Sequence, residues 1–191
     1  MRKGFTLVEL SIVLIIIGLI IGGVMKGTDL INSAKQKKVY NTWLKEWQVV
    51  INMYQDRTGK VLADGTANGG TAASEDGAMD GIDLNATSTV QDRLKEIGLK
   101  LPTSNVASSG AYRIEGKNVT SEAVVTLGKD TTSGKNVIKI SDVPTDVAVA
   151  FDTISDGELG QGSGSFKWDG NTTLQWPNVE TTKKVNVILE L

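Results

Sequence analysis

Two hydrophobic patterns follow one another in the N-terminal part of the chain. Residues 5–25 are almost continuously apolar and carry one charge, at Glu9. A run of this length matches the about 20 residues that a helix needs to cross the hydrocarbon core of a bilayer. Over residues 26–58 apolar side chains instead recur at three- and four-residue steps, which is typical of an amphipathic helix. We therefore expect one long helix from Phe5 to about Thr58, with a membrane-spanning first half and a second half that covers a globular core.

Residues 59–191 predict a small head of mixed helix and strand. Residues 60–87 are rich in Gly, Ala, Asp and Thr, have little to bury and predict a long loop. A capping box at Ser88–Gln91 would start a short helix that ends near Ile97. Asp142 is expected to cap a second short helix. Runs rich in β-branched residues predict strands at Ala111–Ile114, Ala123–Leu127, Val137–Ile140 and Val185–Leu191. The predicted fold class is α+β, with the long N-terminal helix packed on a small antiparallel sheet.

Composition removes most catalytic chemistries. The chain has 191 residues, 20 Lys and Arg against 22 Asp and Glu, a net charge of −2, no Cys and no His. Without Cys the chain can form no disulfide, no iron–sulfur cluster and no thiolate zinc site. Without His it can form no Ser-His-Asp triad and no HExxH motif. We therefore expect no enzyme and no cofactor. The nearly balanced charge does not favour a nucleic-acid partner either.

Two oxygen-rich stretches leave calcium as an alternative to plain loop structure. The first contains Asp76, Asp80, Asp83 and Asn85, but its spacing is not that of an EF-hand, so a solvated loop is the preferred interpretation. The second contains Asp152, Asp156 and Glu158 around Gly157, and a structural turn is preferred there. No metal ligand is therefore assigned.

The short basic start, Met1–Gly4, raises the question of a signal peptide. Such a peptide would have an apolar stretch of about 7–15 residues before a small-residue cleavage site. The run over residues 5–25 is longer, although Gly22 and Gly23 resemble a weak cleavage site. An uncleaved membrane anchor is the better interpretation.

Glu9 is the residue of the anchor that most needs an explanation. A carboxylate within an apolar helix costs about 2.5–3.5 kcal/mol on insertion scales. One interpretation places Glu9 near the membrane surface, where its side chain reaches water. The other gives it a positive partner. A free α-amino group at Phe5 would suit, because residues four apart share a helix face, and the same amine on a neighbouring subunit would also set the register between chains.

The segment from Gly4 to Leu10, with the sequence GFTLVEL, resembles the processing site of type IV prepilins and of type II secretion pseudopilins. The resemblance implies that a membrane peptidase cuts between Gly4 and Phe5 and then methylates the new terminal amine of Phe5. It also implies that Glu9 pairs with the terminal amine of an adjacent subunit. The chain would then consist of a leader at 1–4, a transmembrane and assembly helix at 5–25, an amphipathic stalk helix at 26–58 and a pilin head at 59–191.

This resemblance implies a structural function. The expected protein is a subunit of a type IV pilus-like filament, held in the inner membrane as a single-pass protein with its head in the periplasm. Its expected partners are copies of itself in a helical filament, the prepilin peptidase, an inner-membrane assembly platform and, before assembly, membrane lipid. A pseudopilin of type II secretion, or a minor or tip pilin with a binding role, remains an alternative. Trp43 and Trp47 are expected to pack in the core rather than form a ligand patch.

Overall fold

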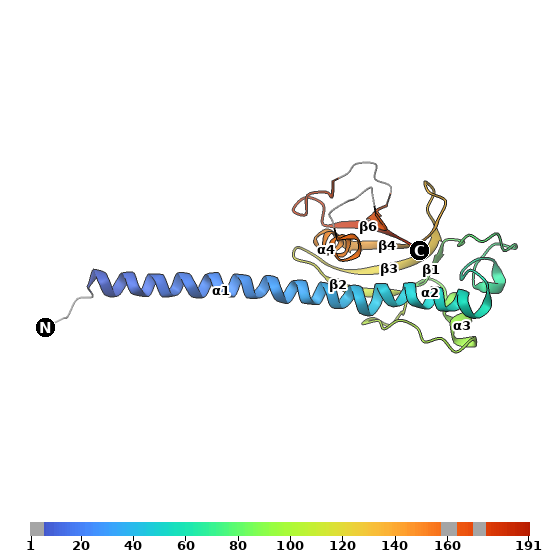
Figure 1. Ribbon diagram of the computed structural model, residues 1–191, viewed down its shortest axis with the longest axis horizontal. Coiled ribbons are helices and arrows are strands. Elements are labelled where there is room, and N and C mark those ends of the chain that lie inside the picture. Colours follow the sequence, from blue (N-terminus) through green and yellow to red (C-terminus); the bar gives the residue numbers. More distant parts are fainter. Residues whose placement is uncertain (1–5, 158–163, 170–174) are drawn as a thin grey trace. The chain divides into compact units, whose positions relative to one another are not determined.

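The computed structural model describes residues 6–157, 164–169 and 175–191 (Figure 1). The chain forms two compact units, 1–36 and 37–191. The first unit is helical, because helix α1 (Leu7–Val39) begins there. Its most apolar 18-residue window has a mean hydropathy of 2.7, and none of that window is buried. This helix is long and apolar enough to cross a membrane, as the sequence predicts.

The helical backbone continues into the second unit but changes its hydrogen-bonding pattern there. A π-helical turn, η1 (Tyr40–Leu44), precedes helix α2 (Lys45–Thr58). Gly59 ends α2 with a left-handed φ of 69°, a conformation that glycine adopts without a steric penalty. The predicted end near Thr58 is confirmed, whereas the π turn has no counterpart in the sequence analysis. The predicted start at Phe5 lies outside the described residues.

The second unit contains a six-stranded sheet in the order β1-β3-β4-β6-β5, with β2 also paired to β3. All five described strand pairings are antiparallel. The α+β class is therefore confirmed. The strands are β1 (Ile82–Asp83), β2 (Ala111–Glu115), β3 (Thr120–Lys129), β4 (Asn136–Pro144), β5 (Phe166–Trp168) and β6 (Lys184–Glu190). The two shortest strands, β1 and β5, were not predicted, because two or three residues are too few to show an alternating pattern.

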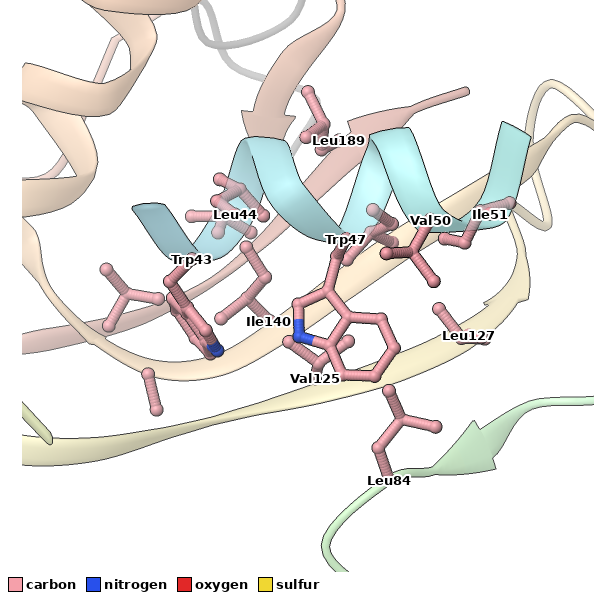
Figure 2. Close-up of a cluster of buried hydrophobic side chains, with 14 of the residues drawn as sticks. Trp43, Leu44, Trp47, Val50, Ile51, Leu84, Val125, Leu127, Ile140 and Leu189 are labelled. Carbon is pink, nitrogen blue, oxygen red and sulfur yellow. The ribbon is translucent and has the colours of Figure 1, made fainter. Parts of the chain in front are cut away.

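The core lies where the π turn and α2 cover one face of the sheet (Figure 2). Trp43, Leu44 and Trp47 have no exposed surface, and they face sheet residues such as Val125 and Ile140. The predicted core position of both tryptophans is confirmed. Each indole Nε1 is buried without a hydrogen-bond partner among the described residues, so hydrophobic burial must outweigh two unsatisfied donors.

The predicted capping box of the first short helix is wrong in detail. Helix α3 (Thr89–Glu96) begins after Ser88, but the Ser88 side chain makes no capping bond. Gln91 does not reach back to the helix start. Its side chain is buried, and its Nε2 donates to the carbonyl oxygen of Leu84 at 2.6 Å. The side chain satisfies a buried loop carbonyl instead of the helix N-terminus, which sequence spacing alone does not reveal.

The predicted cap of the second short helix is also wrong. Helix α4 (Thr145–Asp156) begins after Pro144, and Asp142 lies within β4. Asp142 has a φ of 57°, and the pairing of β4 with β6 shifts register between Ile140 and Val143. The residue therefore forms a β-bulge, which carries the strand directly to the helix start.

The long loop over residues 60–87 buries more than its composition suggested. Leu62, Met79, Ile82 and Leu84 are buried in the core. The loop also contains a 3₁₀ turn, η2 (Thr66–Asn68). The expectation of little to bury is therefore wrong, because a few apolar side chains spaced along a polar loop can each reach the core without any periodic pattern.

Candidate assembly site at the start of the first helix

The N-terminus of α1 is closed by a reciprocal pair of contacts between Thr6 and Glu9. The backbone amide and the hydroxyl of Thr6 each donate to Glu9 Oε2 at 2.8 Å, and the amide of Glu9 donates to Thr6 Oγ1 at 3.2 Å. This is a capping box, in which a threonine and a glutamate three residues later satisfy donors at the helix start. The Glu9 side chain therefore has a local role in capping the start of the helix, in addition to any role between chains.

The capping box uses only one of the two carboxylate oxygens of Glu9. Both bonds from Thr6 end on Oε2, so Oε1 accepts no hydrogen bond from a described residue. The residue is exposed, and it lies between the exposed apolar side chains of Val8 and Leu10. A carboxylate in apolar surroundings needs compensation, and a neighbouring cation could bind the second oxygen without opening the cap.

The predicted processing residues cannot be placed beside this carboxylate. Gly4 and Phe5 lie outside the described residues. Their roles in cleavage and N-methylation stay predictions from the motif, as does the pairing of Glu9 with a terminal amine.

The rest of the helical unit exposes a long apolar surface. No residue of α1 is buried, and large apolar side chains are exposed from Leu7 to Ile31. At Gly18, Gly22, Gly23 and Gly27 an added Cβ would meet nothing within 4 Å. A monomeric soluble protein rarely exposes so large an apolar surface, so this helix is built for lipid or for other protein chains.

The first oxygen-rich stretch is used to shape its own loop. Asp80 Oδ2 accepts the backbone amides of Gly65, Thr71 and Ala72 at 3.0, 2.7 and 2.8 Å. Asp83 Oδ1 accepts those of Asn85 and Ala86. Over residues 6–157, 164–169 and 175–191, no group of three or more acidic side chains is arranged to hold a metal ion. These contacts give the acids a structural role, and calcium binding stays untested.

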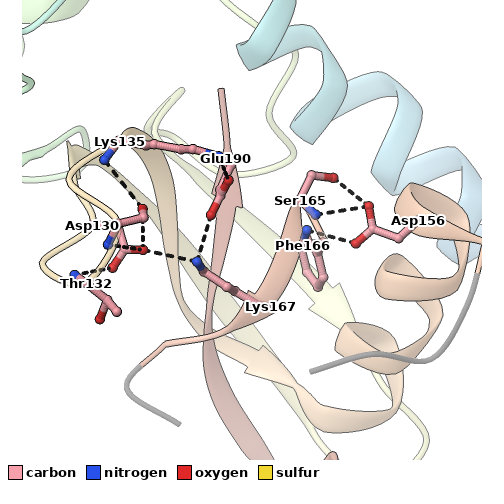
Figure 3. Close-up of polar contacts among 9 residues, drawn as sticks. Asp130, Thr132, Lys135, Asp156, Ser165, Phe166, Lys167 and Glu190 are labelled. Carbon is pink, nitrogen blue, oxygen red and sulfur yellow. Dashed lines mark hydrogen bonds and ion pairs between the residues drawn. The ribbon is translucent and has the colours of Figure 1, made fainter. Parts of the chain in front are cut away.

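In the second stretch, Asp156 at the end of α4 contacts the start of β5 (Figure 3). Its carboxylate accepts the amide of Phe166 at 3.0 Å and the hydroxyl of Ser165 at 2.6 Å. Burial by itself would raise the pKa of the Asp156 carboxyl, but the hydrogen bonds from Ser165 and Phe166 lower it overall. Asp152 accepts the indole N–H of Trp176 at 2.9 Å, and Glu158 lies outside the described residues.

The head also contains an ionic cluster that the sequence analysis missed (Figure 3). Lys167 Nζ lies 3.1 Å from Asp130 Oδ2 and 2.7 Å from Glu190 Oε1, and Lys135 Nζ lies 2.7 Å from Glu190 Oε2. The amide of Thr132, together with Ser133 and Lys167, holds the pKa of Asp130 well below its ordinary value against the opposing effect of burial. The cluster joins the β3–β4 turn to β5 and β6, and we assign it to stability rather than to function.

Comparison with known proteins identifies the N-terminal segment. A family model described as the prokaryotic N-terminal methylation motif matches residues 1–25. No curated protein and no solved structure matches the chain. The match covers the leader, the residues expected at the cleavage site, the capping box and the apolar run. Residues 1–25 thus carry the motif that is typical of type IV prepilin-like and pseudopilin precursors.

Proposed function

We propose that this protein is a structural subunit of a type IV pilus-like filament, assembled through its N-terminal helix. The observation that carries the proposal is a carboxylate, Glu9, at the start of a helix whose apolar side chains are exposed, and within a methylation motif. Prepilin peptidase would cut between Gly4 and Phe5 and methylate the amine of Phe5. Burial of the apolar helices against one another would then replace their contacts with lipid.

Pairing between Glu9 and the new terminal amine explains why the acid lies in this position. An isolated carboxylate is costly in an apolar bundle, and a hydrogen-bonded cation offsets this cost. The free Oε1 of Glu9 would accept the amine of a neighbouring chain while Oε2 keeps the capping bonds to Thr6. Each added subunit would then bring one amine and one carboxylate to the growing end, which fixes the axial register of the chains.

The proposed location follows from the same helix. Before assembly the helix would cross the inner membrane once, with the head in the periplasm and an assembly platform at the membrane. The final location would be a surface pilus. The head would act as a structural and contact module without catalytic activity, consistent with the absence of Cys and His from the sequence.

The test separates the charge of Glu9 from its capping role. Glu9→Gln retains the hydrogen-bonding pattern of a capping box but removes the charge. Glu9→Ala removes both. Ser11→Ala serves as a control, because it removes a polar side chain in the next turn whose hydroxyl donates only to the Val8 carbonyl among the described residues.

We expect all three variants to be processed and to remain in the membrane at normal levels. Sheared-fibre yield should fall at least about tenfold for Glu9→Gln and Glu9→Ala, because an unpaired buried charge costs roughly 3–5 kcal/mol. Ser11→Ala should assemble normally. Normal fibre yield from Glu9→Gln would contradict the proposal.

Imaging of cells that lack the gene distinguishes a pilus from a pseudopilus. Loss of surface fibres supports the pilus subunit. Intact fibres together with impaired protein secretion would favour the pseudopilin alternative, and a low copy number in sheared fibres would favour a minor or tip pilin.

A further inference from the structure

The longest strand of the sheet, β3, has one side divided between two short strands. β2 pairs with β3 from Ala111 to Glu115, and β1 pairs with it at Ile82 and Asp83. On its other side β3 pairs with β4. β2 is therefore an edge strand. The outer side of such a strand presents a row of backbone donors and acceptors that a strand of another molecule can bind.

Alternate residues of β2 turn their backbone groups away from β3. The amide of Val125 donates to the carbonyl oxygen of Gly110 at 2.8 Å, so these two residues form a hydrogen-bonded pair where β2 begins. In an antiparallel ladder, pairs of this kind alternate with pairs that exchange no hydrogen bonds. The register of β2 on β3 therefore turns the amides and carbonyls of Ala111 and Arg113 to the outer side of the strand.

The carboxamide of Asn105 binds the backbone of Arg113 in the way that a neighbouring strand would. Its Nδ2 donates to the Arg113 carbonyl oxygen at 2.8 Å, and its Oδ1 accepts the Arg113 amide at 2.7 Å. A primary amide offers a donor and an acceptor of the same kind as a peptide group. The side chain therefore occupies both backbone groups that a further strand would need at this residue.

The same segment of chain also binds the other outward residue, Ala111. Its amide donates to the carbonyl oxygen of Ser108 at 3.3 Å, and its carbonyl oxygen accepts the hydroxyl of Ser104. Residues 104–108 are neither helix nor strand. This covering segment therefore closes the edge of β2 without presenting a regular row of donors and acceptors of its own.

A filament makes an uncovered edge of this kind harmful. In the proposed filament identical heads would be held near one another, and tethering raises the effective concentration of neighbours to about the millimolar range. The charges of β2 would not keep two copies of the strand apart, because its exposed side chains Arg113 and Glu115 have opposite signs. Strand addition between heads would compete with the ordered contacts through α1.

We propose that Asn105 blocks the β2 edge against strand addition by a second copy of this chain. Removal of the carboxamide frees the amide and carbonyl of Arg113, and β2 of a second molecule binds there. The purpose of the block rests on the proposed filament function. The block itself is a property of the head and is tested without fibres.

Hydrogen exchange at single amides, followed by NMR on the detergent-solubilised full chain, tests the contact directly. At low protein concentration the Arg113 amide should exchange at least about tenfold faster in Asn105→Ala than in the unmodified chain. The Tyr112 amide faces β3 and should keep its protection. The matched control is Asn118→Ala, because Asn118 is also exposed but its Nδ2 donates to the Val179 carbonyl oxygen at 3.2 Å, away from this edge.

The dependence on protein concentration tests the block. At higher concentration Asn105→Ala should form dimers and larger species in sedimentation, and its Arg113 exchange should slow again at least about fivefold, because a second strand then covers the amide. The unmodified chain and Asn118→Ala should keep their size over the same range. Unchanged Arg113 exchange in Asn105→Ala would overturn the inference. So would faster exchange without added association, which would leave Asn105 with a purely structural role.

A proline at Arg113 should reverse the association. Because the Arg113 amide points away from β3, Arg113→Pro removes the outward donor without removing a bond to β3. Asn105→Ala combined with Arg113→Pro should therefore stay as dispersed as the unmodified chain. Association as strong as that of Asn105→Ala alone would refute the inference.

Tryptophan fluorescence in urea checks that each variant folds. If the double variant does not fold, the concentration dependence of Arg113 exchange in Asn105→Ala decides alone. A negative result here refutes only the block at the β2 edge, because none of these measurements needs fibres. A chain that forms no fibres refutes the proposed function and leaves these measurements interpretable.

Discussion

Removing the Lys167 ammonium should destabilise the head measurably, because two carboxylates depend on it. Lys167→Met keeps most of the aliphatic side chain but leaves Asp130 and Glu190 without their shared cation at 3.1 and 2.7 Å. Asp130 has only 5 % of its side chain exposed, and Lys167 has 18 %. Solvent therefore screens this group poorly compared with an ordinary surface pair.

The expected magnitude lies between those of exposed and buried ion pairs. Exposed pairs contribute about 0.2–1 kcal/mol, and breaking a buried pair costs about 3–5 kcal/mol. After the substitution Asp130 still accepts hydrogen bonds from Thr132 and Ser133, and Glu190 still pairs with Lys135. We therefore expect a loss of about 2 kcal/mol in the free energy of unfolding at pH 7.

The pH dependence gives a second signature. The folded-state pKa values of Asp130 and Glu190 are both lowered, Asp130 chiefly by the Thr132 amide and Glu190 chiefly by Lys135. Each group therefore stabilises the head above its unfolded pKa, about 3.9 for Asp and about 4.3 for Glu, and this contribution is lost as the pH falls through the folded value. Stability should be flat from pH 7 to about 5 and then fall, and less steeply in Lys167→Met.

The assay is urea unfolding of the detergent-solubilised full chain, followed by tryptophan fluorescence. Lys184→Met is the matched control, because Lys184 and Asp142 form a more exposed pair at 3.4 Å, with 42 % and 56 % of their side chains exposed. The control should lose less than about 0.5 kcal/mol. Equal losses for the two variants, or no coupling between Lys167→Met and Asp130→Asn in a double-mutant cycle, would refute the reasoning.

Three further predictions address the loop, the core and the N-terminus. Gly70→Ala should lower the free energy of unfolding by roughly 2 kcal/mol or more and expose the 60–87 loop to proteases, because the new Cβ would lie 2.2 Å from Asp80 Oδ2. The control Gly128→Ala, whose Cβ would have its nearest neighbour at 3.4 Å, should match the unmodified chain in the same urea and proteolysis assays. Trp47→Ala should lower the free energy of unfolding in the urea assay by about 3–5 kcal/mol, since the Trp47 side chain has no exposed surface. Mass spectrometry of the mature N-terminal peptide should find methylated Phe5; an intact Met1 in native material would contradict processing.

Sequence patterns predict the structure of this chain correctly wherever they repeat over many residues. The apolar run, the stalk periodicity and the longer strands each bury several side chains at regular intervals, so their pattern reports the burial directly. Single polar side chains are not predicted in this way. Gln91 and Asp142 have sequence contexts that favour helix caps, but Gln91 satisfies a loop carbonyl and Asp142 forms a β-bulge. A cap competes with every other partner within reach, and only the folded chain shows which partners those are.

The sequence by itself indicated a helix that is long and apolar enough to cross a membrane, with a carboxylate near its start and a predicted processing site before it. These features depend on local chemistry and on a motif of adjacent residues, GFTLVEL. Tertiary structure decided the rest. Arg57 and Glu46 on α2 bind Ile97 and Thr103, about 40 to 60 residues away in the chain. The cluster around Lys167 likewise joins residues from three separate parts of the sheet. No local pattern encodes such contacts, because their partners come together only when the sheet has formed.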